Sequence, residues 1–110
     1  MMNNYFTTCL PAGRFRHFAI KMIKEEKLKR LRIIPGVGKS IANDLWNIGI
    51  REPTDLKDRN PEELYRLSNH HAGMIQDRCL LYVFRCAVYF ASTDVKKQDC
   101  EKLKWWNWKD

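Results

Sequence analysis

The chain has 110 residues, 45% of them hydrophobic, which suits one domain whose core needs neither metal nor disulfides. Its 20 Lys and Arg outnumber its 13 Asp and Glu, and the formal charge of +7 favours a polyanionic partner such as nucleic acid. No apolar stretch could span a bilayer and residues 1–13 lack a secretory signal pattern, so we expect a cytoplasmic protein with no membrane partner.

The first predicted element is a basic helix over residues 15–32. Its apolar residues Phe18, Met22, Leu28 and Leu31 recur at roughly helical spacing. Basic residues fill the remaining positions, among them Lys21, Lys24, Lys27, Lys29, Arg30 and Arg32. They could lie along a phosphate backbone, or they could form a solvated face in which Glu25 and Glu26 pair with neighbouring lysines.

A tight turn and a short second helix follow. The turn is Pro35-Gly36-Val37-Gly38, and the apolar spacing of Val37, Ile41, Leu45 and Ile48 predicts a helix that ends at Gly49. Backbone amides of Gly36, Gly38 and the first helical residues would face outward at a positive helix end, where a phosphate oxygen can approach. Lys39 and Ser40 could reinforce that contact, while Val37 would point between the helices.

The second half of the chain is also predicted to be helical. A brief turn starts at Pro53, a helix capped by Asn60 runs through Leu67, and a central core helix covers residues 75–91. Polar residues on that last helix share one stripe, namely Arg78, Tyr82, Arg85 and Tyr89. We therefore expect an all-α, compact single domain of about five helices over residues 15–110. Residues 1–14 form an N-terminal extension that could be disordered.

The aromatic tail, residues 103–110, allows two interpretations. Trp105, Trp106 and Trp108, with Lys104 and Lys109, could stack on exposed bases, or they could anchor the tail against the core or a second subunit. Packing is the more common use of such residues.

No catalytic or metal-binding set is evident, and we predict that the protein is not an enzyme. Gly38-Lys39-Ser40 ends like a nucleotide-binding loop, but Ile33 stands where that motif needs glycine, and no strand precedes it. Cys79 and Cys86 would lie two helical turns apart, roughly 10 Å, which is too far for one zinc ion. We expect Cys9, Cys79, Cys86 and Cys100 to be free thiols, and no metal or cofactor is predicted.

The turn resembles the signature of the helix-hairpin-helix superfamily, matching it at residues 34–38 and at Ala42. Residues 28–110, including the Trp-Trp-Asn-Trp-Lys ending, are similar to a small bacterial pathogenicity-locus family, some members of which carry a mitomycin-resistance label. The superfamily resemblance implies phosphate contacts from the amides of Gly36, Gly38 and Ser40. It also implies a possible monovalent cation held by the carbonyls of Ile34 and Val37.

The predicted function is sequence-independent DNA binding in DNA repair or a stress response, with the motif at about residues 28–48. The expected contact residues are Gly36, Val37, Gly38, Lys39, Ser40, Lys27, Lys29, Arg30 and Arg32. A lone hairpin should bind weakly unless the chain forms a homodimer or joins a complex. The alternative is a regulatory protein-interaction module with a purely structural hairpin and a tryptophan tail as its contact surface.

Overall fold

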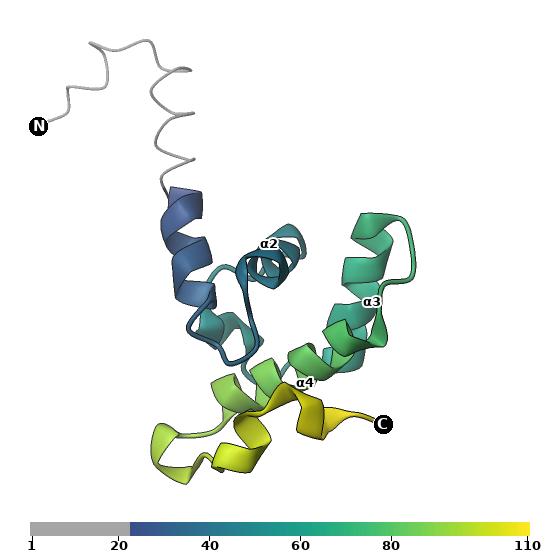
Figure 1. Ribbon diagram of the computed structural model, residues 1–110. Coiled ribbons are helices and arrows are strands. Elements are labelled where there is room, and N and C mark those ends of the chain that lie inside the picture. Colours follow the sequence, from purple (N-terminus) through teal and green to yellow (C-terminus); the bar gives the residue numbers. More distant parts are fainter. Residues whose placement is uncertain (1–22) are drawn as a thin grey trace, which may run out of the picture.

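The computed structural model describes residues 23–110 and is all-α over that part of the chain, with no strand (Figure 1). After a helix that covers residues 23–31, the α-helices are α2 (Lys39–Asn47), α3 (Pro61–Ala72) and α4 (Arg78–Ser92). Short 3-10 turns are η2 (Pro53–Leu56), η3 (Val95–Lys97), η4 (Cys100–Leu103) and η5 (Trp105–Trp108). The predicted all-α domain is confirmed, whereas the predicted extension and the start of the basic helix lie outside the described residues.

The core forms around α4, as the apolar run in the sequence predicts. Phe84 is 0% exposed, and α4 contacts α3, η2 and the tail turns η4 and η5. Apolar residues of the first helix, α2, η2, α3 and the turns between them complete the core, including Leu31, Ile34, Leu45, Ile50, Leu56 and Leu64. None of the described helices is long and apolar enough to cross a membrane.

Two helix boundaries differ from those predicted. Asn60 caps α3 as expected, by accepting the Glu62 amide hydrogen bond, but the helix continues beyond Leu67 to Ala72. It stops there because Gly73 adopts a left-handed conformation at φ 73°. His70 and His71 therefore lie in the last turn of α3.

Helix α4 begins at Arg78, three residues later than predicted. Asp77 is its N-cap and accepts a hydrogen bond from the amide of Cys79 (2.9 Å), so the preceding residues stay outside the helix. Met74 and Ile75 are consequently 64% and 83% exposed. Asp77 pairs with neither Arg78 nor Arg85, since its carboxylate serves as this cap and both arginines pair with Asp110.

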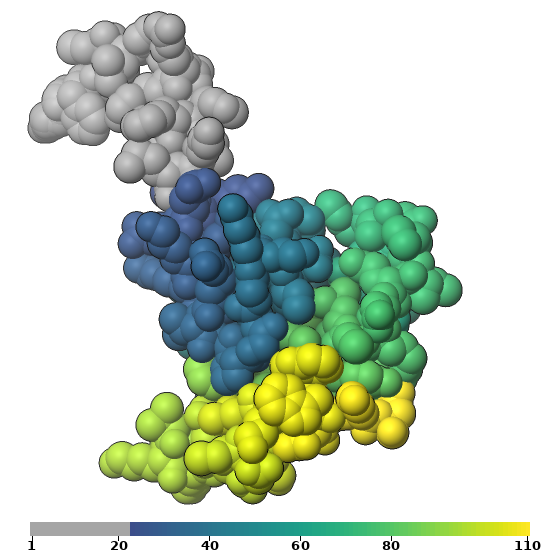
Figure 2. Space-filling model, viewed as in Figure 1, coloured from purple at the N-terminus to yellow at the C-terminus, as the bar shows by residue number. Residues whose placement is uncertain are grey.

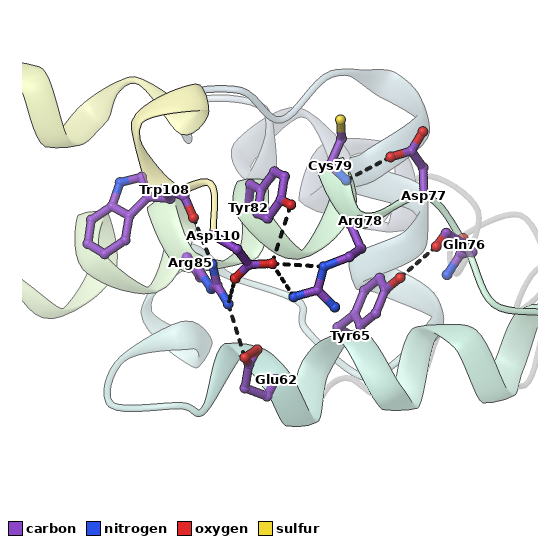
Figure 3. Close-up of polar contacts among 10 residues, drawn as sticks. All are labelled: Glu62, Tyr65, Gln76, Asp77, Arg78, Cys79, Tyr82, Arg85, Trp108 and Asp110. Carbon is purple, nitrogen blue, oxygen red and sulfur yellow. Dashed lines mark hydrogen bonds and ion pairs between the residues drawn. The ribbon is translucent and has the colours of Figure 1, made fainter.

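The polar stripe of α4 is covered by the C-terminal tail, which folds back along the helix (Figures 1 and 3). Arg85 is the main link, since it pairs with Asp110 (2.9 Å), donates to the Trp108 carbonyl (2.7 Å) and reaches Glu62 (3.1 Å). Arg78 also pairs with Asp110, and the Tyr89 and Trp108 rings lie 5.7 Å apart. The tail is therefore docked through its polar and aromatic side chains, as the packing interpretation of the tryptophans expected.

Tail docking should weaken in acid. Hydrogen bonds from Arg78 and Arg85 hold the pKa of the Asp110 side chain below its ordinary range. A carboxyl whose pKa is lower in the docked tail stabilises docking fully when the pH is above its undocked pKa. That stabilisation is lost as the pH falls through the docked pKa. We expect the near-ultraviolet circular dichroism of the tail tryptophans to decrease below about pH 4. In Asp110→Asn this acid step should be absent, and an unchanged step would contradict the assignment.

Candidate functional site

The turn between the first helix and α2 is tightly bonded. The Val37 amide donates to the Ile34 carbonyl (3.0 Å), and the Ala42 amide donates to the Gly38 carbonyl (2.9 Å). The side chains of Ile34 and Val37 are buried, as is Leu45 of α2. Val37 thus points between the helices as expected, and because its amide is already bonded it offers no free donor. The Ile34 carbonyl that the resemblance implies as a cation ligand accepts this same bond.

The first turn of α2 is exposed and has no side-chain cap. Gly38 occupies the N-cap position without a side-chain hydrogen bond, and no acidic residue lies in the first turn. Lys39 and Ser40 follow it, and both are exposed. The first amides of a helix have no partner within it, and the helix dipole makes this end positive. Exposed amides, a hydroxyl and an ammonium group are therefore gathered at one point.

Beside this helix end is a small basic recess of about 190 Å³. It is lined by Glu25, Leu28, Lys29, Arg32 and Lys39. Glu25, Leu28 and Lys29 share one face of the first helix, and Arg32, in the turn directly after it, continues the same spacing of three or four residues. The structure thus brings three predicted contact residues together, Lys29, Arg32 and Lys39, with one acidic residue among them.

Two other predicted contact residues, Lys27 and Arg30, face a different partner. Both pair with Glu52, the N-cap residue of η2, at 3.1 Å in the case of Arg30. Hydrogen bonds from Lys27 and Arg30 lower the pKa of the Glu52 side chain. These two cations hold the first helix against the segment after α2, so their charge is partly neutralised. No local pattern indicates this pairing, because Glu52 lies 25 residues from Lys27 and 22 residues from Arg30 along the chain.

The tail contacts the turn between the first helix and α2 through Trp105. Gly36 adopts φ +85°, and a Cβ atom placed there would lie 3.0 Å from Cδ1 of Trp105. Figure 2 shows the C-terminal segment against the hairpin residues. Trp105 and Trp108 are both half-buried, which leaves Trp106, at 50% exposure, as the tail tryptophan most open to a partner.

The contact between Trp105 and Gly36 makes a specific stability prediction. Gly36→Ala should destabilise the protein by about 2 kcal/mol, since it adds left-handed backbone strain and a close contact. Gly73→Ala is the matched control, because Gly73 has φ +73° but open space around it, and it should cost only about 1 kcal/mol. Urea denaturation measures both. Equal losses would show that Trp105 does not restrict the Gly36 position.

The sequence also matches known proteins. Residues 24–110 fit the profile of a family described as pathogenicity locus, Cdd1, and so include the hairpin, the recess and the tail. The chain belongs to the pathogenicity locus family. A mitomycin resistance protein, McrB, of Streptomyces lavendulae is 40% identical over 58 residues, which are 53% of this chain and 55% of that protein. The chain therefore spans about half the length of that relative. No solved structure matches.

The thiols of this pathogenicity locus protein are free in the described residues. Cys86 is buried, which raises the pKa of its thiol to about 11, whereas Cys79 and Cys100 are exposed. Cys9 lies outside the described residues. Within residues 23–110 no group of three or more His, Cys, Asp or Glu is placed to hold a metal ion.

Proposed function

We propose that this chain binds the phosphate backbone of DNA without reading its sequence, using a helix-hairpin-helix motif at about residues 28–48. The observation that carries the proposal is the basic recess beside the uncapped first turn of α2. There Lys29, Arg32 and Lys39 face a helix end whose dipole favours negative charge.

The groups gathered here suit phosphate contacts. Amides, ammonium groups and guanidinium groups bind phosphate oxygens and fix the position of a protein on DNA without carrying sequence information. One motif with three cations predicts modest affinity that falls steeply with salt, since each neutralised phosphate releases counterions. Lys27 and Arg30 would add little, because Glu52 already pairs with both.

A role in DNA repair or a stress response belongs to the same proposal. It accords with the relative named for mitomycin resistance, although resistance itself is not proposed for this chain. The second candidate is a regulatory protein-interaction module, for which the exposed ring of Trp106 offers a contact. It predicts negligible DNA affinity and a complex that is lost in Trp106→Ala.

Fluorescence anisotropy with two unrelated DNA sequences, each single- and double-stranded, tests the proposal. The full chain should bind both sequences with affinities within about threefold, and the affinity should drop at least tenfold between 50 and 200 mM salt. No binding at the lowest salt concentration would reject the proposal and leave the hairpin as a structural element.

A further inference from the structure

A second pocket, of about 370 Å³, lies where α2, the start of α4 and the tail meet. Its apolar lining comes from Ile41 of α2 and from Leu80 and Val83 of α4. Trp105 lines it from the tail, next to Gly36. The pocket thus offers aliphatic surface and an indole ring in one concavity, which is typical of sites that bind part of a ligand.

The charge of this pocket is opposite to that of the protein. Its lining includes the carboxylates of Asp44 and Asp77 but no Lys, Arg or His, in a chain of net charge +7. Asp44 makes no ion pair with any residue between 23 and 110, and its partial burial raises the pKa of its side chain, an effect that the nearby charge of His71 reduces. Asp77 accepts hydrogen bonds from the amide and the thiol of Cys79, which hold the pKa of its side chain below its ordinary range, so this carboxylate stays charged.

The edge of the pocket adds another acceptor and an apolar surface. The side-chain nitrogen of Gln76 donates to Ser68 (2.9 Å) and Asn69 (3.1 Å), which leaves its side-chain carbonyl oxygen to a ligand. Met74 and Ile75 directly precede Gln76 and are 64% and 83% exposed. Two adjacent large apolar side chains next to an acidic pocket are a surface that a partner can cover.

We propose that this pocket receives an arginine or lysine side chain from a segment of a partner protein, whose neighbouring apolar side chains cover Met74 and Ile75. The aliphatic stem would pack on Ile41 and Leu80, and the cationic group would lie near Trp105 between the two carboxylates. The same carboxylates repel phosphate, so this pocket is a different site from the basic recess, although Gly36, one of the predicted phosphate contacts, also lines the pocket.

A peptide titration followed by nuclear magnetic resonance tests this site. The probe is acetyl-Leu-Arg-Leu-amide, added to the full ¹⁵N-labelled chain, and the control peptide has citrulline, which is neutral and of similar shape, in place of arginine. We expect saturable shifts at the amides of Asp44 and Cys79 and at the Trp105 indole N–H. The citrulline peptide should bind at least tenfold more weakly. Equal binding of both peptides, or no saturable shift at millimolar concentrations, would overturn the proposal.

Variants identify the groups responsible. Asp44→Asn and Asp77→Asn should each lower the affinity for the arginine peptide roughly three- to fivefold. Asparagine at position 77 can still cap α4. Asp58→Asn removes the same charge outside the pocket, at a left-handed position that asparagine tolerates, and should have no effect. N-acetyl-arginine methylamide distinguishes the source of the cation. If it binds as tightly as the peptide, the pocket is a small-molecule site and the partner surface is rejected.

Discussion

Replacing Phe84 with alanine should destabilise the protein by about 3–5 kcal/mol, enough to unfold much of a domain of this size. Phe84 is 0% exposed and belongs to α4, which contacts α3, η2 and the tail. Removing its ring takes away packing from the buried core cluster and leaves a cavity that the surrounding side chains cannot fill without moving. The measurement is the free energy of unfolding from urea denaturation followed by far-ultraviolet circular dichroism.

The control for this variant is Cys79→Ala in the first turn of the same helix. Cys79 is exposed, so its replacement should change the free energy of unfolding by no more than about 0.5 kcal/mol. A loss below about 1 kcal/mol in Phe84→Ala would mean that α4 is not the centre of the core.

Reversing two charges of the recess should abolish most of the DNA binding. Arg32 and Lys39 both line the recess, so the double variant Arg32→Glu, Lys39→Glu places two negative charges where phosphate would lie. We expect at least a tenfold loss of affinity at low salt, equal for unrelated sequences, and a salt dependence whose slope falls by about 2. Fluorescence anisotropy across a salt series measures both quantities.

A second double variant separates this effect from that of net charge. Lys96 and Lys97 form part of η3, are exposed and lie outside the recess. Lys96→Glu, Lys97→Glu changes the net charge equally and should lower the affinity much less. If the two double variants lose the same affinity, binding depends on overall charge and the recess is not the site.

Much of the turn between the first helix and α2 could be predicted from the sequence because its signals are local. The two glycines, the proline and the apolar spacing of residues 34–45 specify a turn between helices, and the buried side chains of Ile34, Val37, Ala42 and Leu45 agree with that pattern. The polar stripe of α4 was likewise visible as helical spacing. That it is covered by the tail depends on Asp110 and Trp108 meeting Arg85, a contact between distant residues.

The features that the sequence missed depend on contacts across the fold. Lys27 and Arg30 pair with Glu52 and do not line the recess, whereas Lys29 and Arg32 do. Helical spacing alone cannot tell which of these two pairs of basic residues lines the recess. The predicted start of α4 at Ile75 is wrong because Ile75 was counted in the apolar run, whereas it is 83% exposed and lies before the Asp77 cap. The acidic pocket combines residues of α2, the start of α4 and the tail, which are far apart in the sequence, so no motif indicates it.

Mapping DNA onto the structure tests the central claim most directly. A short duplex is titrated into the ¹⁵N-labelled full chain, and the shifts of the backbone amides are followed by nuclear magnetic resonance. We predict that the largest shifts occur at Gly38, Lys39 and Ser40 and along the recess at Lys29 and Arg32, and that they are the same for a second sequence. Saturable shifts confined to α3, α4 or the tail, with the hairpin amides unchanged, would contradict it.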